Sequence, residues 1–476
     1  MKLNVLIKCL LLVISSALLF ITNISQAAKT SLITKGPKNI PSYGSLYKSA
    51  LSANGRFVVF SSKAEDLVIG DTFGSDIFLH DKNKDEITLI SLGINGEQAN
   101  GESDEATISA NGRFVAFSSA ASNLVPGDTD NKTDVFVFDR LTKKMSCISC
   151  NSIGLNSESN SPSISADGRF VAFVSSGWDG SSDRSDVYVH DRQQNKVVQV
   201  SVNSENIAGD QASSEPFISA NGRFVAFSSW SSNLVSTTTN AYYEHHVFVR
   251  DLQKKKTTRI SVNSDGLPGN AFSVSSSPAL SADGRFVAFA SRATNLVPND
   301  NNFRTDIFIH DRLTGKTERV SVDSSGNEGN GDSHYTELEN PWIIDSGMCA
   351  CFTTVDPFFI GSGSPSITAD GRFVAFDSSA SNLITKDMNT RQDVFLHERD
   401  TGITRRVSVD SKGKEASYGS GFPSISANGR VMVFTSKANI TNYTNPENPQ
   451  GGFSMWIPKE NIYSKDLHVN TARRVR

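Results

Sequence analysis

The sequence predicts an all-β chain folded as a seven-bladed β-propeller of four-stranded antiparallel blades. The first observation is a nine-residue phrase, Ser-Ala-Asn-Gly-Arg-Phe-Val-Val-Phe at 52–60, which recurs in variant form to give seven copies. The phrase places its glycine at Gly55, Gly112, Gly168, Gly222, Gly284, Gly371 and Gly429. The steps between these glycines are 57, 56, 54, 62, 87 and 58 residues, longer than helical solenoid repeats and suited to a four-stranded blade. Seven copies therefore predict seven blades.

The second observation is the strand pattern inside one repeat. In the third copy, turn residues separate four β-rich runs, which cover 163–165, 169–175, 186–191 and 197–202. Asp167-Gly168, between the first two runs, accepts the positive φ angles of a tight hairpin. The second run is apolar nearly throughout, with Phe170 and Phe173 among valine and alanine, which indicates burial on both faces. Radial repetition of such sheets protects their edges, as in a propeller.

The third observation concerns closure of the ring. The seventh repeat has a weak third strand at 453–457, and residues 29–34 near the start of the chain resemble the fourth strand at 256–261. We therefore expect the N-terminal segment to complete the last blade. Residues 466–469 near the C-terminus are an alternative closing strand, and the sequence leaves both models open.

Residues 1–27 have the features of a signal peptide. Lys2 and Lys8 precede or border an apolar run at 9–24, and Ser25-Gln26-Ala27 supplies small residues for cleavage before Ala28. We expect the mature chain, 28–476, to be one periplasmic or secreted propeller domain without a further transmembrane segment. Removing the leader takes the formal charge from −4 to −6, and a mildly acidic chain argues against nucleic acid as a partner.

The repeated phrase, followed by runs such as Asp-Val-Tyr-Val-His-Asp-Arg at 186–192, resembles the TolB-type, WD-like propeller repeat family. The resemblance covers all seven repeats, because the turn, the aromatic second strand and the Asp-initiated third strand recur together. It implies a platform for protein interaction or ligand binding, often in the bacterial periplasm. The chain departs from TolB itself, since it lacks room for an extra N-terminal α/β domain and has seven repeats where that protein has six blades.

The loops indicate which face binds a partner. In an antiparallel meander, the connections from second to third strand and from fourth to first strand share one face, and these are the long ones. The longest is an insertion at about 324–363 between blades five and six, with roughly 25 extra residues by loop-length comparison. It is either a lid that stabilises the ring or a recognition loop. Its candidate partner-binding residues are Tyr335, Trp342, Phe352, Phe358 and Phe359.

The loops between second and third strands carry a repeated pattern of acids and amides at relative positions 1, 3 and 7. The residues are Asp128, Asp130 and Asp134, then Asp300, Asn302 and Asp306, then Asp387, Asn389 and Asp393. Such oxygen-rich groups can hold calcium, although the EF-hand pattern fails because Thr133 occupies the position that requires glycine. The alternative is that these side chains cap turns through hydrogen bonds to the backbone.

Other polar residues follow the repeat and predict blade structure. His80, His190, His310 and His397 share one third-strand position, which indicates packing within each blade, whereas His245, His246 and His334 lie outside the repeat and are weak site candidates. The arginines that follow the turn glycines are expected to pair across strands with third-strand acids. Cys147 and Cys150 replace ordinary fourth-strand residues, so their side chains are expected to point to opposite faces of the sheet and cannot form a disulfide without distortion. Cys349 and Cys351 would share a face if extended, and a zinc site joining all four is disfavoured.

These observations predict an exported propeller that binds a protein or glycan partner through its long-loop face. No cofactor is specified apart from the calcium hypothesis. The alternative is a propeller hydrolase or lyase that acts on a glycan at the mouth of the ring, with acids such as Asp128 and Asp300 and a histidine, His334, from the insertion.

Overall fold

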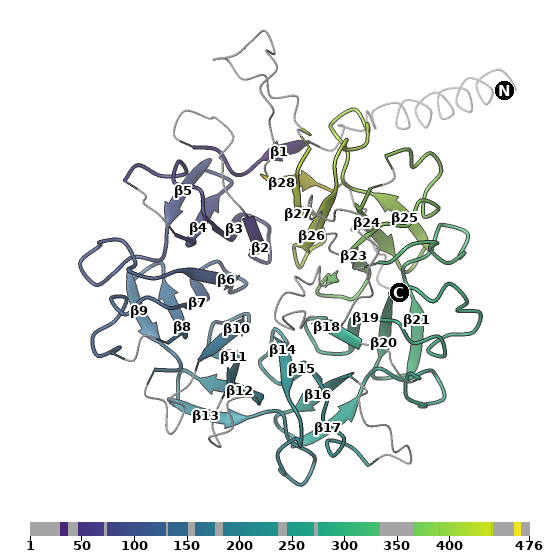
Figure 1. The fold of residues 1–476 in the computed structure, drawn as a ribbon, viewed down its shortest axis with the longest axis horizontal. Coiled ribbons are helices and arrows are strands. Elements are labelled where there is room, and N and C mark those ends of the chain that lie inside the picture. Colours follow the sequence, from purple (N-terminus) through teal and green to yellow (C-terminus); the bar gives the residue numbers. More distant parts are fainter. Residues whose placement is uncertain are drawn as a thin grey trace, which may run out of the picture.

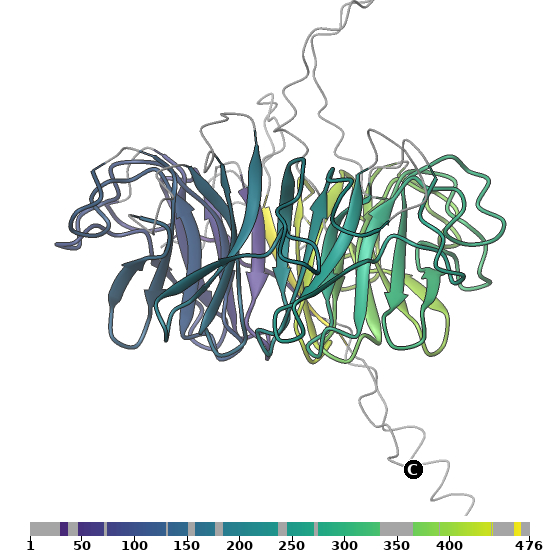
Figure 2. The ribbon, with the colours of Figure 1, turned by 90° about the horizontal axis from the view of Figure 1, so that it is seen from below.

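A computed structural model describes residues 29–36, 46–70, 74–129, 132–150, 158–176, 184–236, 245–270, 275–333, 365–389, 391–438, 440 and 461–467. These ranges contain 28 strands and no helix. The strands form seven four-stranded antiparallel sheets arranged as a ring, a seven-bladed β-propeller (Figure 1). Figure 2 shows the ring edge-on, with the strands crossing its thickness.

Each blade uses four strands in order, from the ring axis to the rim. Blade one is β2 (Leu46–Leu51), β3 (Phe57–Ser62), β4 (Asp76–Asp81) and β5 (Glu86–Leu89), and blade two is β6 (Ser103–Ile108), β7 (Phe114–Ser119), β8 (Asp134–Asp139) and β9 (Lys144–Cys147). Blade three is β10 (Ser159–Ile164), β11 (Phe170–Ser176), β12 (Ser185–Asp191) and β13 (Lys196–Gln199), and blade four is β14 (Ser213–Ile218), β15 (Phe224–Ser229), β16 (His246–Asp251) and β17 (Lys256–Arg259).

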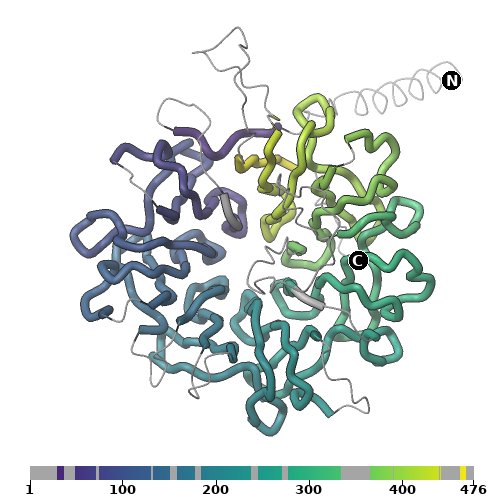
Figure 3. The backbone as a smooth tube through the Cα atoms, viewed as in Figure 1, coloured from purple at the N-terminus to yellow at the C-terminus, as the bar shows by residue number. Residues whose placement is uncertain are grey.

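The remaining blades complete the ring traced in Figure 3. Blade five is β18 (Ser275–Leu280), β19 (Phe286–Ser291), β20 (Asp306–Asp311) and β21 (Lys316–Arg319), and blade six is β22 (Ser366–Ile367), β23 (Phe373–Ser378), β24 (Asp393–Glu398) and β25 (Ile403–Arg406). Blade seven is β26 (Ser420–Ile425), β27 (Val431–Ser436), β28 (Asn461–Asp466) and β1 (Thr30–Leu32).

The glycine of the repeated phrase joins neighbouring blades. Gly168 has φ 76°, and a Cβ atom added there would lie 2.1 Å from Cδ2 of Phe114, the residue that begins the second strand of the preceding blade. The same close approach recurs at Gly112 against Phe57, Gly222 against Phe170, Gly284 against Phe224 and Gly371 against Phe286. Only a residue without a side chain permits both the left-handed conformation and this contact. The glycine therefore serves the turn and the blade interface together.

The arginine after that glycine pairs with the acid that ends the third strand, as the sequence predicts. In blade two, Arg113 Nε and Nη2 donate to Asp139 at 2.9 and 2.7 Å. The arrangement recurs between Arg56 and Asp81, Arg169 and Asp191, Arg223 and Asp251, Arg285 and Asp311, and Arg372 and Glu398. The Arg113 guanidinium also lies 4.7 Å from the centre of the Phe114 ring. Each blade from one to six is thus tied across its second and third strands.

The N-terminal strand closes the ring. β1 pairs with β28, with Thr30 opposite Lys465 and Leu32 opposite Tyr463. The third strand of blade seven is therefore Asn461–Asp466, which corrects the expectation of a third strand at 453–457, a segment outside the described residues. Residue 466 ends that third strand, so the alternative closure by 466–469 is also wrong.

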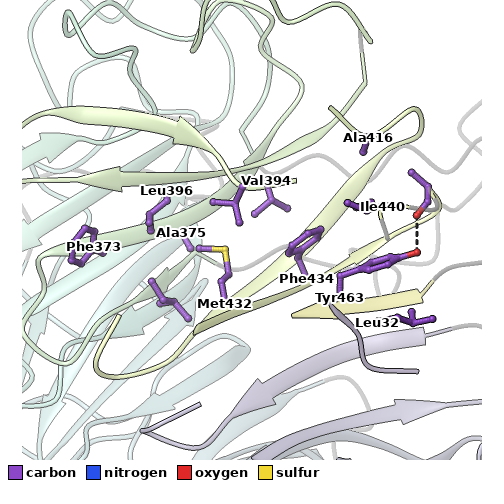
Figure 4. Close-up of a cluster of buried hydrophobic side chains, with 13 residues drawn as sticks. Leu32, Phe373, Ala375, Val394, Leu396, Ala416, Met432, Phe434, Ile440 and Tyr463 are labelled. Carbon is purple, nitrogen blue, oxygen red and sulfur yellow. Dashed lines mark hydrogen bonds between the residues drawn. The ribbon is translucent and has the colours of Figure 1, made fainter. Parts of the chain in front are cut away.

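The last blade is held by the same kind of core as the others. Leu32 is buried in one cluster with Phe434 and Tyr463, and the Tyr463 hydroxyl donates to the Ala438 carbonyl at 2.8 Å (Figure 4). Burial raises the pKa of Tyr463 to about 12, which keeps this donor protonated. A segment from the start of the chain thus shares a core with strands from its end.

The insertion interrupts the first strand of blade six. Ser333 pairs with Ser378, and Ser366 pairs with Ala375. In blade five the equivalent pairs are Ser275 with Ser291 and Ala279 with Ala288. Thirty-two residues separate Ser333 from Ser366, where three separate Ser275 from Ala279. The expected segment 324–363 thus begins with ordinary loop and strand residues, and the extra residues enter after the strand has begun.

Candidate functional site

The first strands lie nearest the ring axis, and within the described residues those of every blade except blade six contain a β-bulge. Their register shifts within the strand, and the bulged residue has a positive φ in Glu105, Ser161, Glu215, Ser277 and Phe422. Bulges of this kind redirect side chains and recur next to functional sites. In blade six, the 32-residue segment leaves the strand at this same place.

A glutamate at this bulge connects blade four to blade five. The Glu215 carboxylate accepts hydrogen bonds from the Ser277 amide at 2.7 Å and the Ser277 hydroxyl at 3.2 Å. It also accepts from the Ser228 hydroxyl at 2.9 Å. Glu105 receives Ser161 in the same way between blades two and three. These carboxylates therefore stabilise the bulges of neighbouring blades beside the axis.

Blade four adds two aromatic rings next to this glutamate. Trp230 and His245 lie next to the Ser229–His246 pair that ends the ladder, and their rings stack with centroids 4.5 Å apart. Trp230 is 41% exposed, whereas His245 is only 7% exposed and its Nδ1 has no hydrogen-bond partner among the described residues. At Trp230's position the other blades have small or charged residues, including Lys63, Ala120, Arg292 and Ser379. We call Trp230, His245 and Glu215 the blade-four cluster.

The electrostatics of the blade-four cluster keep its imidazole neutral. Burial lowers the pKa of His245 to about 4, against the opposing effect of the Glu215 charge. A neutral imidazole offers one acceptor and one donor, but Nδ1 of His245 is buried, so a partner would meet the Trp230 ring and not this nitrogen. His246 differs, because its Nδ1 lies 3.0 Å from the Ser261 hydroxyl, in the place of the aspartate–serine pair of other blades. His334, the third histidine outside the repeat, lies outside the described residues.

The acid-rich loop of blade five gathers around an arginine. Arg319 Nη1 lies 3.4 Å from Asp300, 3.3 Å from Asp306 and 2.9 Å from Glu328. Asn302 donates to Asp306 at 3.0 Å, while its own side-chain oxygen accepts from the Arg304 amide at 2.8 Å. The structure therefore brings the three predicted residues together around the guanidinium of Arg319. The Asn302 side chain also caps the turn through the Arg304 amide, which is the alternative to calcium binding that the sequence left open.

Blade six repeats this arrangement residue by residue. Arg406 Nη1 lies 3.3 Å from Asp387, 3.0 Å from Asp393 and 2.7 Å from Glu415. Asn389 donates to Asp393 at 3.0 Å. Burial raises the pKa of Asp387 and of Asp393, and it raises the pKa of Asp300 in blade five to about 6. The arginines were missed from the sequence, although Arg259, Arg319 and Arg406 share one position in the fourth strand.

Blade two departs from blades five and six. Asp134 is buried and accepts a hydrogen bond from the Ser149 hydroxyl, Asp128 is buried nearby in the chain, and Asp130 lies outside the described residues. Cys147 takes the position that Arg319 and Arg406 occupy in the other blades. The loops of blades five and six therefore place their acids beside an arginine, whereas blade two has a cysteine at that position.

Cys147 and Cys150 form a disulfide, which corrects the expectation that they could not pair. The expectation assumed a strand running through both residues. β9 ends at Cys147, and the chain bends over the next three residues, which brings the two Cα atoms to 5.7 Å. That distance suits a disulfide. Cys349 and Cys351, and with them the four-cysteine zinc site, fall outside the described residues.

The repeat histidines serve blade packing, as predicted. His310 Nδ1 lies 2.9 Å from the Thr317 hydroxyl, and His397 Nδ1 lies 2.9 Å from the Thr404 hydroxyl. Burial lowers the pKa of both imidazoles to about 4. Each threonine donates in turn to a carbonyl of the preceding blade, Val262 or Val322. These histidines therefore have a structural role, because their hydrogen bonds help to hold neighbouring blades together near the rim.

The residues expected to bind a partner lie outside the described part of the chain. They are Tyr335, Trp342, Phe352, Phe358 and Phe359. The described long-loop connections nevertheless expose apolar side chains, with Phe303 78% exposed and Met388 77% exposed. The ranges described contain no helix that is both long and apolar enough to cross a membrane.

Comparison with solved structures gives the same fold. An oligogalacturonate lyase in complex with manganese has a TM-score of 0.51 and 11% identity, covering 93% of this chain and 94% of that chain. An oligogalacturonate lyase from Vibrio parahaemolyticus has a TM-score of 0.51 and 10% identity with the same coverage. TolB from Acinetobacter baumannii is also a structural neighbour, with a TM-score of 0.39 and 14% identity over 76% of this chain and 62% of that chain. No protein-family model and no curated protein matches the sequence. At these identities the likeness establishes a shared fold and leaves function to the site.

Proposed function

We propose that this chain is an exported propeller, periplasmic or secreted, that binds a protein or glycan partner through its long-loop face. The observation that carries the proposal is the blade-four cluster, where a half-exposed Trp230 covers a buried His245 beside Glu215. Exposed aromatic anchors over polar groups are typical of recognition sites, because the ring supplies area and the polar groups fix orientation.

Trp230 and His245 depart from the repeat, whereas Glu215 has a counterpart in Glu105 and helps to join blades four and five. The turn glycines, the arginine–acid pairs and the repeat histidines recur around the ring, so the fold accounts for them. Trp230 stands where other blades have residues as different as Lys63 and Ala120, which shows that blade geometry requires no aromatic ring there. A partner that contacts the exposed Trp230 ring explains the aromatic residue at this position.

Capture from an envelope extract with the full mature chain tests the proposal. Trp230→Ala should reduce capture of the partner about 30-fold, the effect of losing an aromatic anchor worth about 2 kcal/mol. Leu313→Ala is the matched control, because Leu313 is an equally apolar exposed residue, 75% exposed, in a short turn between third and fourth strands. Equal capture by the Trp230 variant and the parent, or loss with the Leu313 variant, would contradict the assignment. Calorimetric titration with oligosaccharides separates a glycan partner from a protein partner.

A second candidate is a lyase or hydrolase that acts on a glycan. The fold similarity to oligogalacturonate lyases over 93% of this chain favours it. The described site favours binding, because a histidine with a pKa of about 4 is a weak general base and His245 is covered by Trp230. Incubation with polygalacturonate, followed by ultraviolet detection of unsaturated products with and without manganese, tests lyase activity. Product that disappears with His245→Gln would replace the binding proposal.

Calcium is the proposed cofactor of the acid-rich loops. Each described cluster holds three carboxylates against one guanidinium, so a divalent cation bound beside Arg319 or Arg406 would balance the remaining negative charge. Native-state binding raises the melting temperature through linkage. Melting curves that coincide in excess calcium and in chelator would reject the proposal, and Glu415→Gln should remove part of any calcium-dependent shift.

A further inference from the structure

The disulfide of blade two lies apart from the blade-four cluster and has an unusual span. Cys147 and Cys150 are separated by Ile148 and Ser149, which gives the Cys-x-x-Cys spacing. A disulfide that closes so short a loop restricts the unfolded chain least, so stabilisation gives little reason for it. The same spacing is found in disulfide oxidoreductases, where it lowers the proton affinity of one thiol. The spacing therefore points to chemistry at the sulfur atoms.

The surroundings distinguish the two sulfur atoms. The Cys150 amide N–H points at Cys147 Sγ, with a nitrogen–sulfur distance of 2.9 Å. A hydrogen bond of this kind favours a thiolate on Cys147 over one on Cys150. The Asp134 carboxylate lies within 4.8 Å of both sulfur atoms and opposes a thiolate on either, so the amide is what distinguishes the two. The intervening turn is fixed by Ser149, whose hydroxyl accepts from the Val135 amide at 2.9 Å and donates to Asp134. Reduction would thus leave a pre-formed turn in which Cys147 forms a thiolate more readily than Cys150.

Both cysteines are partly exposed, whereas the two residues between them are buried. Ile148 and Ser149 are buried, whereas Cys147 and Cys150 are half-buried at the edge of the core between blades one and two. Reactive cysteines are partly exposed in this way, and structural cysteines in a core are inert.

We propose that Cys147–Cys150 is a redox-active disulfide that oxidises a dithiol of a partner protein. A thiolate of the partner attacks Cys150 Sγ, the Cys147–Cys150 bond breaks, and Cys147 leaves as the thiolate held by the Cys150 amide. The second thiolate of the partner then attacks the partner's sulfur atom in the mixed disulfide. The two partner cysteines form a disulfide, and Cys150 is released as a thiolate. Two electrons pass to this chain, the partner gains a disulfide, and the two protons of its thiols end on Cys147 and Cys150. Attack falls on Cys150 because the better-stabilised thiolate is the faster leaving group.

Equilibration of the mature protein with glutathione mixtures tests the exchange. After acid quenching and alkylation, mass spectrometry of the peptide that contains 147–150 gives the reduced fraction, and near-ultraviolet circular dichroism reports the fold. We expect this peptide to become fully reduced while the spectrum stays native, and the reduced protein to be reoxidised by glutathione disulfide. A bond that remains closed until the protein unfolds would overturn the proposal. The measurement uses the unaltered chain. The same digest gives the redox state of Cys349 and Cys351 separately.

A pair of single variants tests the order of attack. Cys150→Ser leaves Cys147 beside the amide of residue 150, and Cys147→Ser leaves Cys150 without that donor. We expect Cys147 to react with iodoacetamide at pH 7 at least ten times faster than Cys150, as measured by peptide mapping. Equal rates, or a faster Cys150, would overturn the assignment of Cys147 as the leaving thiolate.

Discussion

Ser333 pairs with Ser378 at the start of a strand that Ser366 continues opposite Ala375. The two serines of this strand are separated by 32 residues of sequence, yet they take the places of Ser275 and Ala279 in blade five. Both ends of the insertion are thus anchored in the innermost sheet strand, beside the ring axis. The insertion is an addition to an otherwise complete blade.

Removal of residues 335–363, with His334 joined to Ser364, should leave the ring folded. The junction restores the Ser-x-x-Pro spacing that Ser159 to Pro162 shows in blade three. We expect the melting temperature to change by less than about 3 °C, the effect of roughly 1 kcal/mol, while partner capture falls if the insertion contributes to binding. Scanning calorimetry and extract capture measure the two effects. A deletion of 328–360 is the informative contrast, because it removes Glu328 from Arg319 and should destabilise blade five.

Substitution of Gly168 by alanine should destabilise the interface between blades two and three. The new Cβ atom would meet the Phe114 ring at 2.1 Å, and the φ of 76° strains any residue with a side chain. Gly315 is the matched control, because its φ is also 76° but no atom lies within 4 Å of the added Cβ. We expect about 1 kcal/mol for Gly315→Ala and about 2 kcal/mol more for Gly168→Ala in denaturant unfolding. Equal losses would show that the turn alone requires the glycine.

The sequence predicted the repeated architecture because one local pattern was read seven times. The Asp167-Gly168 turn, the buried second strand around Phe173 and the pairing of Arg169 with Asp191 follow from residue chemistry within a blade. The N-terminal closing strand was the favoured one of two candidates, because its sequence resembles the fourth strand of other blades. These features repeat, so each copy supports the interpretation of the next.

Features that occur once, or that join distant segments, were not predicted. The Cys147–Cys150 bridge depends on where β9 ends, and strand ends are set by tertiary contacts such as Val135 with Ser149. β28 lies beyond a long undescribed connection, so its place could not be found by counting from the repeat glycine. The site around Trp230 and His245 was visible only as two departures from the repeat, because stacking and burial are properties of the folded ladder.

Asp300 gives a pH-dependent prediction. Burial and the neighbouring Asp306 charge raise its pKa to about 6, above its value in the unfolded chain. The native state therefore binds more protons between about pH 4 and 6, and the stability contributed by protonated Asp300 is lost as pH rises through that window. An asparagine side chain has no proton to lose, so Asp300→Asn should keep this contribution at high pH. The free energy of unfolding of the variant, relative to that of the parent, should therefore rise by about 2 kcal/mol between pH 4 and pH 8.

Thermal unfolding at the two pH values measures the Asp300 effect. Asp265→Asn, which changes an exposed carboxylate in a turn, is the control and should show no such dependence. Asp387→Asn in blade six should follow Asp300→Asn in direction, because burial also raises the pKa of Asp387. An advantage of Asp300→Asn that is the same at both pH values would contradict the assignment.

Truncation at the two ends tests the closure of the ring. A chain that starts after Lys35 loses the β1 pairing with β28, including the bond from the Ile33 amide to the Ile462 carbonyl at 2.8 Å. It also loses the buried side chains of Leu32 and Ile33, which together stabilise the fold by about 4 kcal/mol. The exposed edge of β28 should then promote association, because its backbone groups lack partners. We expect a lower melting temperature and larger species in light scattering.

Truncation at the C-terminus, in contrast, should leave the closure of the ring intact. Ending the chain after Leu467 keeps all of β28, the bond from the Leu467 amide to the Arg430 carbonyl and the ion pair of Asp466 with Lys82, so it should be nearly neutral. Ending it at Lys465 removes the last two of these contacts and should cost about 1 kcal/mol. An N-terminal truncation that melts like the parent, beside a truncation after Leu467 that aggregates, would place the closing strand at the C-terminus and refute the pairing of Leu32 with Tyr463.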